Sequence, residues 1–269
     1  MSELSNIVDL SIVVESSTLE KATFSVPLIV GYHTKYADRT RSYASLEELT
    51  DDGFAVTDSI YGAAAAVFAQ NPRVPSLKVG RLALPPTTKV ELTPVAANST
   101  EYKVAVNGTE YTYTSDSSAT VAEICGGLVT ALGTITGVTV SDQTTYVRLV
   151  ATSAGNKLEV DNLTGSSLLA VAQNHNDPGI ATDMAAILNA DPAFYGVIPV
   201  TGGAAELEAL GAWCLSNEKQ MFAASQDSAI PSSAVDDVAS ELKGTNNDRS
   251  VLMFHDRQSQ HAGASAAGY

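Results

Sequence analysis

Two stretches of the sequence place reactive residue types directly after an apolar run. The first is 199–204 (PVTGGA), where two glycines lead into a helical pattern, as in phosphate-binding loops. It does not match G-x-G-x-x-G, and it is not a P-loop because no Lys-Ser/Thr pair follows. We therefore interpret it as a tight strand-to-helix turn. The second holds His255, Asp256 and His261, which could form a base with its orienting carboxylate or bind a metal. Without a G-x-S-x-G elbow to complete a triad, polar residues at a domain edge are the simpler interpretation.

The remaining candidates are weaker. His33 and His175 are isolated in loops, where surface histidines are the default. The pairs 51–52 and 236–237 are adjacent aspartates that point to different faces of a helix, and 236–237 falls in an expected first turn, where negative charge suits the helix dipole. The alternating tyrosines of 109–114 (TEYTYT) are typical of ordinary strand packing. We therefore expect a non-enzyme without catalytic, cofactor-binding or metal-binding residues.

Composition limits the partners of the chain. The 269 residues are 45% hydrophobic and only 17% charged, which favours a packed core over disorder. The formal net charge of −15 argues against a nucleic-acid binder that neutralises phosphates. Cys125 and Cys214 lie in apolar helical contexts and are expected to be buried free thiols of a protein made in a reducing cytosol. The N-terminus lacks a basic signal region, and the longest apolar run, 61–69, is too short for direct membrane insertion.

The elements that must position these residues fall into three blocks. Up to residue 85, the patterns predict strands at 7–15 and 23–30, helices from Ser45 and over 59–70, and a strand at 76–81. Thr- and Val-rich alternation then predicts a hairpin around Asn107-Gly108, strands at 138–140, 146–151 and 158–160, and one helix over 120–132. After 165, helices over 180–188, 204–215 and 233–243 alternate with strands at 195–200, 220–224 and 250–254, which indicates a parallel sheet.

The simplest architecture is therefore an α/β domain interrupted by an inserted β-rich (α+β) domain. We expect an N-terminal arm over 1–22, the first part of the α/β domain over 23–85, the inserted domain over 86–165 and the second part of the α/β domain over 166–269. The linkers 84–86 (LPP) and 164–167 (TGSS) combine stiff and flexible residues, as is common at domain boundaries.

Residues 27–81 resemble the N-terminal region of tail sheath proteins of contractile-tailed bacteriophages. The matching pattern is a "plIvG" strand, then "r…Y.sleel…GF", then "A..yFaQnP.p..l.vGr". Its residues here are Tyr43, Leu46, Gly53, Phe54, Phe68, Ala69, Gln70, Asn71, Pro72, Leu77, Val79, Gly80 and Arg81. The resemblance implies a sheath-type α/β domain that carries an inserted β-rich domain. Since such subunits continue further, it also implies that the second α/β part is incomplete at Tyr269.

The resemblance also implies a function and its partners. Sheath subunits form hexameric discs that stack helically around the tail tube protein, between the baseplate and tail terminator proteins. The sheath is assembled in the host cytoplasm, resides in the virion, and contracts to drive the tube through the host envelope. Neighbouring subunits exchange strands. The candidate inter-subunit strand comprises Ile7, Val8, Leu10, Ile12, Val13 and Val14, and the candidate lattice-contact charges are Arg39, Arg41, Arg73, Lys78 and Arg81.

Two other classes of function stay open from the residues alone. One is an α/β enzyme or ligand-binding protein with a β-rich cap domain, which would use 201–204 and His255. The other is a carbohydrate- or surface-binding protein whose function lies in the inserted domain.

Overall fold

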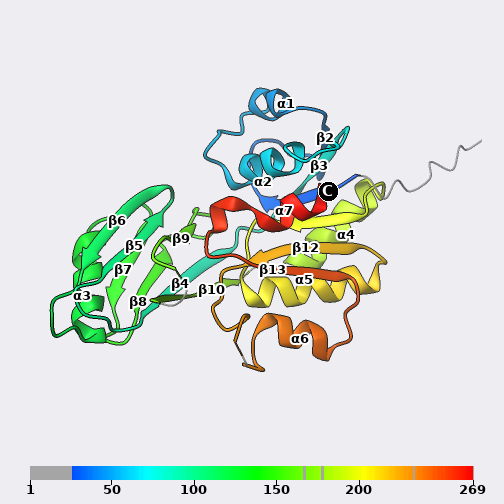
Figure 1. Cartoon of the computed structure of the whole chain (residues 1–269). Coiled ribbons are helices and arrows are strands. Elements are labelled where there is room, and N and C mark those ends of the chain that lie inside the picture. Colours follow the sequence, from blue (N-terminus) through cyan, green and yellow to red (C-terminus); the bar gives the residue numbers. More distant parts are fainter. Residues whose placement is uncertain (1–25, 166–167, 177–178, 233, 269) are drawn as a thin grey trace, which may run out of the picture.

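A computed structural model of the chain describes residues 26–165, 168–176, 179–232 and 234–268 (Figure 1). The expected strand at 7–15, with all six candidate inter-subunit residues, lies outside the described residues. The described chain combines α/β architecture with further β-sheets, in accord with the general α/β class that the sequence predicts.

The α/β part is a six-stranded sheet with the order β13-β12-β11-β1-β3-β2, and only β2 runs antiparallel to its neighbour. Its central strand, β1, is apolar and nearly continuous in burial, as expected for a parallel strand that is covered on both faces. The strands are β1 (Leu28–Tyr32), β2 (Thr40–Tyr43), β3 (Leu77–Leu82), β11 (Gly196–Pro199), β12 (Gln220–Ser225) and β13 (Ser250–Phe254).

Helices cover both faces of this sheet (Figure 1). On one face, Leu28 and Val30 of β1 pack in a core formed with α4 (Ile180–Ala190), α5 (Ala204–Ser216) and α6 (Val238–Gly244). On the opposite face, Ile29 packs in a core formed with α1 (Leu46–Asp51), α2 (Ser59–Phe68) and α7 (Ala262–Ala267). The alternation of β1 side chains between the two cores follows from the period of two in a strand.

Side-chain caps set the starts of α1, α3 (Val121–Leu132) and α6. Ser45 caps α1 by accepting a hydrogen bond from the backbone N–H of Glu48, while the Glu48 side chain accepts one from Ala44 N at 2.7 Å. Helix α6 is shorter than predicted and begins at Val238. Asp237 is therefore its N-cap rather than part of its first turn, and it accepts hydrogen bonds from the N–H groups of Ala239 and Ser240.

The β-rich part has its own hydrophobic core between two sheets and one helix. The sheets have the orders β10-β4-β8-β7 and β6-β5-β9, and α3 (Val121–Leu132) packs against them. The predicted hairpin is confirmed, with Asn107 and Gly108 at φ 50° and 83°, as a type I′ turn requires. The strands are β4 (Thr87–Pro94), β5 (Glu101–Val106), β6 (Thr109–Thr114), β7 (Val138–Asp142), β8 (Val147–Ala151), β9 (Val160–Asn162) and β10 (Leu169–Asn176).

Several polar bonds join the β-rich part to the α/β part near β9. Asp161 accepts a hydrogen bond from the backbone N–H of Ser259 at 3.0 Å and another from its hydroxyl. Lys157 donates to the carbonyl of Thr57 at 2.6 Å. Strand β10 pairs with β4 along its whole length and also contacts α5. The two parts therefore share a bonded boundary as well as two covalent connections.

Candidate functional site

The predicted glycine turn lies at the carboxyl end of β11. A Cβ at Gly202 would collide with the carbonyl oxygen of Ala224, so glycine is required for the close approach of two backbones. Glu206, in the first turn of α5, is 3% exposed and accepts a hydrogen bond from the Thr201 hydroxyl. Burial raises the pKa of this carboxyl to about 7, against the opposing effect of the Thr201 bond. A phosphate bound here would need open backbone N–H groups at the start of α5, and the Glu206 carboxyl lies in that first turn instead. This supports the interpretation of residues 199–204 as a structural turn.

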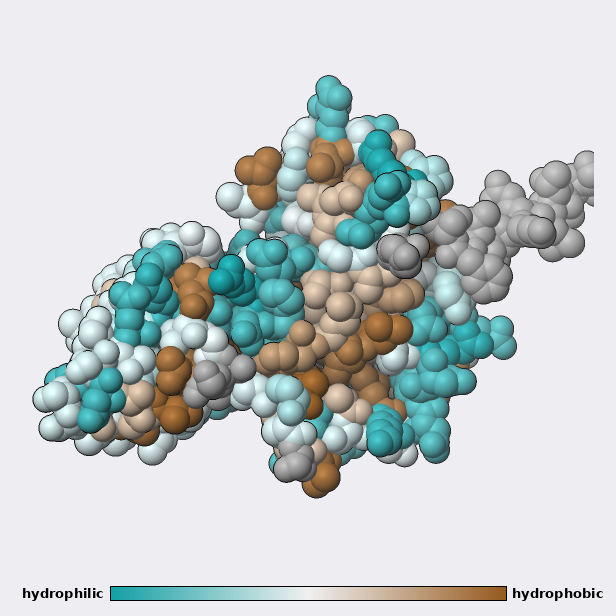
Figure 2. Space-filling view, in the orientation of Figure 1, coloured by the Kyte–Doolittle hydropathy of each residue, from teal (hydrophilic) through white to brown (hydrophobic). Residues whose placement is uncertain are grey.

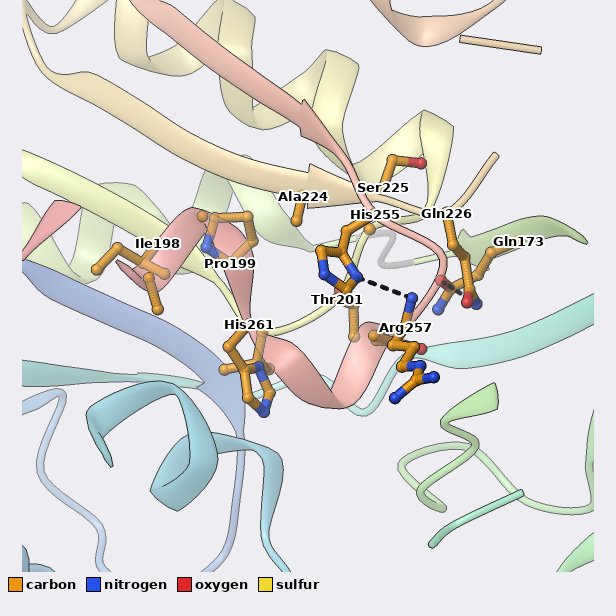
Figure 3. Close-up of a pocket in the computed structure, with 15 residues that line it drawn as sticks. Gln173, Ile198, Pro199, Thr201, Ala224, Ser225, Gln226, His255, Arg257 and His261 are labelled. Carbon is orange, nitrogen blue, oxygen red and sulfur yellow. Dashed lines mark hydrogen bonds between the residues drawn. The ribbon is translucent and has the colours of Figure 1, made fainter. Parts of the chain in front are cut away.

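The two candidate histidines after β13, His255 and His261, lie apart and do not point toward a common site (Figure 3). His255 Nδ1 accepts a hydrogen bond from the backbone N–H of Arg257 at 3.0 Å. His261 lies against α2, where a Cβ at Gly62 would come within 2.5 Å of its Nε2, and burial lowers the pKa of its imidazole. The cavity between them holds about 20 Å³, room for about one water molecule.

No group of three His, Cys, Asp or Glu side chains in the described part of the chain could hold a metal ion. Cys125 and Cys214 are buried and free, as predicted. Burial raises the pKa of both thiols, to about 11 and about 12.

A larger cleft of about 260 Å³ opens beside this region, between the carboxyl ends of β1 and β11 and the loop before β9. Its walls include Tyr32 at the end of β1 and His33 after it, Thr201 after β11, and Lys157 and Glu159 from the β-rich part. His33 is 7% exposed and packs edge-on against the rings of Tyr36 and Phe54. Sequence reasoning missed this cleft, because its walls come from three distant segments.

The five candidate lattice-contact charges all have partners within the chain. Arg39 bonds the buried Asp183 at 2.6 Å, and Lys78, itself 8% exposed, bonds Asp191 at 2.5 Å. The other three are Arg41, which bonds Asp38 and Asp52; Arg73, which lies over the Phe68 ring; and Arg81, which donates to the carbonyls of Ala37 and Asp38. Their role in contacts between subunits stays a prediction.

Strand β13 forms an open edge of the large sheet. It pairs with β12 on one side, and none of the described strands pairs with its other side. Leu252 packs toward the core with α5 and α6, so Val251 and Met253 face the side of α7, where they are 37% and 38% exposed. Figure 2 shows apolar surface over α7 and the neighbouring strands. Helix α7 itself sits directly on β12, since a Cβ at Gly263 would lie 2.7 Å from the carbonyl oxygen of Phe222.

No helix among the described residues is long and apolar enough to cross a membrane. Comparison with models of known families finds none that matches the chain, and a search of curated proteins finds no relative.

Proposed function

We propose that this chain is a structural subunit of a contractile phage tail sheath. It polymerises around the tail tube, and the assembled sheath contracts to drive the tube through the host envelope. In this role the chain needs surfaces that join copies of itself and no catalytic site or cofactor. Contraction requires two arrangements of rigid subunits, which differ in how their interfaces pack.

The resemblance to sheath proteins is supported by how its residues pack. Tyr43, Phe54 and Phe68 come from different parts of the matching segment, yet all three are buried in the same core. Leu77 and Val79 of β3 complete that core from the sheet. The pattern therefore corresponds to one packed unit of strand, helices and strand, which is what a family-specific fold signature should describe.

The open edge of β13 is the observation that carries the proposal. An unpaired strand edge beside half-exposed Val251 and Met253 is a hazard in a monomer, because other strands can add to it. In a lattice of identical subunits the same edge is a binding surface. The chain also contains a β-prone segment, 7–14, that could supply the added strand from a neighbour. The low charged fraction of 17% suits a subunit with large interfaces, and the net charge of −15 keeps free subunits apart before assembly.

Negative-stain electron microscopy of the full chain tests this proposal directly. We expect rings or tubes at high protein concentration. Deleting residues 1–15 should abolish them and leave the melting temperature of the subunit almost unchanged. Met253→Asp should also abolish assembly, because it places a charge on the open edge, whereas Val56→Asp at a site 68% exposed should not. A full chain that stays monomeric, or assembly that survives both the deletion and Met253→Asp, would contradict the proposal.

A further inference from the structure

The cleft beside β1 lies where the helical connections between strands switch from one face of the sheet to the other. From β1 to β3 the connection carries α1 and α2 on one face, whereas from β11 through β12 to β13 it carries α5 and α6 on the opposite face. The chain segments that leave the neighbouring strands β1 and β11 therefore run to opposite faces of the sheet. In open α/β sheets this crevice is the usual place for a ligand.

The charges around the cleft neutralise one another. Lys35 pairs with Asp58 at 3.5 Å, and Lys157 pairs with Glu159 at 2.9 Å. Glu206 adds a buried carboxyl beside Thr201, where a phosphate group would otherwise approach the start of α5. The walls thus present paired charges together with an acidic group, and they are unsuited to a nucleotide or a free phosphate.

Three side chains in the cleft wall carry polar atoms without a hydrogen-bond partner among the described residues. They are His33 Nε2, Glu159 Oε1 and Gln258 Oε1. His33 Nδ1 accepts the backbone N–H of Lys35 at 3.3 Å, so in the neutral ring Nε2 carries the proton and is a donor. Burial, followed by the charge of Arg81, lowers the pKa of His33 to about 4, so the ring is neutral at pH 7. One donor and two acceptors are what hydroxyl groups can satisfy, since each hydroxyl both donates and accepts.

We propose that this cleft binds one neutral sugar ring. Its volume of about 260 Å³ lies just below the range of about 300–1,000 Å³ that drug-sized ligands fill, which suits a ligand of this size. The ring of Tyr32 in the wall offers apolar surface for the C–H groups of the sugar. The proposal does not depend on the sheath function, because it concerns a site away from the β13 edge.

Isothermal titration calorimetry of the full chain with glucose, galactose and N-acetylglucosamine tests the proposal, with inorganic phosphate and ADP as charged probes. We expect at least one sugar to bind and neither charged probe to do so. Asn156→Trp should block the mouth of the cleft and weaken binding at least about tenfold, because Asn156 is exposed on its wall. Ser117→Trp, in the same β-rich part but outside the cleft wall, should bind as the unmodified chain does.

Two conservative variants test the polar groups. His33→Phe keeps the ring packing against Tyr36 and Phe54 but removes the donor, and Glu159→Gln keeps the side-chain shape. Each should weaken sugar binding about tenfold while the far-UV circular dichroism spectrum is unchanged. The proposal is overturned if no sugar binds at about 10 mM, if phosphate or ADP binds in preference, or if Asn156→Trp leaves sugar affinity unchanged.

Discussion

The buried carboxyl of Glu206 should make the stability of the α/β part fall as the pH rises. Its pKa is about 7 in the folded chain and 4.5 in the reference state, and the side chain is 3% exposed. Between these two values the folded state keeps a proton that the unfolded state releases. The stabilising effect of proton binding is therefore complete below pH 4.5 and is lost as the pH passes 7. A shift of this size corresponds to about 3 kcal/mol of unfolding free energy.

Glu206→Gln removes the titration and keeps the size of the neutral side chain. The Gln carbonyl can still accept the Thr201 hydroxyl. We expect the variant to match the unmodified chain near pH 4.5 and to be up to about 3 kcal/mol more stable at pH 8. The matched control is Glu218→Gln, which changes an exposed carboxylate just after the same helix and should shift stability by less than about 0.5 kcal/mol.

Urea unfolding at pH 4.5 and pH 8, followed by tryptophan fluorescence, measures the effect. Trp213 is the single tryptophan of the chain, it is 9% exposed, and it lies on α5 with Glu206, so its emission reports on this core. Equal gains at both pH values would show that Gln improves packing rather than removing a charge. No gain at pH 8 would show that the Glu206 carboxyl is not held protonated in the folded chain, and the reasoning would fail.

Three further variants test single contacts by urea unfolding. Asp237→Ala removes the cap of α6 and should destabilise the chain by about 1 kcal/mol, with Asp237→Asn largely restoring it; an equal loss in both variants would contradict a capping role. Tyr102→Phe removes a hydroxyl that donates to the Val95 carbonyl at 2.6 Å inside the β-rich core, and should cost about 1–2 kcal/mol, whereas a neutral result would mean that this bond contributes nothing. Lys78→Met leaves Asp191 without its ion-pair partner and should cost about 2 kcal/mol, less than for a fully buried pair because Asp191 reaches solvent; a stabilised variant would show that desolvation of Lys78 outweighs the pair.

Local chemistry made many elements predictable. Ser45 before Glu48, Asn107 before Gly108, and Thr120 before α3 each specify their own end or turn through bonds between near neighbours. Two of the strands that sequence reasoning missed lack such signals. Strand β2 (Thr40–Tyr43) is short and polar, and the second half of β10 (Leu169–Asn176) is a polar run, QNHN. Their pairing with β3 and β4 therefore defines them as strands where the residues alone do not.

The candidate site shows the same limit more strongly. The Lys78–Asp191 pair joins residues that are 113 positions apart, and no spacing rule connects them. His33 was expected on the surface because it is isolated in sequence, yet Phe54 and Tyr36 bury its ring. Sequence reasoning did not single out Glu206, because only the tertiary structure places Thr201 and the β1 crevice around it. Contacts with residues that are distant in the chain bury these side chains, and that burial sets their protonation state.

The place of β11 in the sheet has a consequence for synthesis on the ribosome. Leu28 of β1 pairs with Val197 of β11, about 170 positions later, and the whole β-rich part lies between them. At about 5–20 residues per second, roughly 8–34 seconds pass between the emergence of the two strands. During that interval β1 can pair with β3 along one edge, while the edge that β11 will cover has no partner from its own chain. The nascent chain thus passes through a stage of translation in which the apolar strand β1 has one open edge that must be kept from other chains.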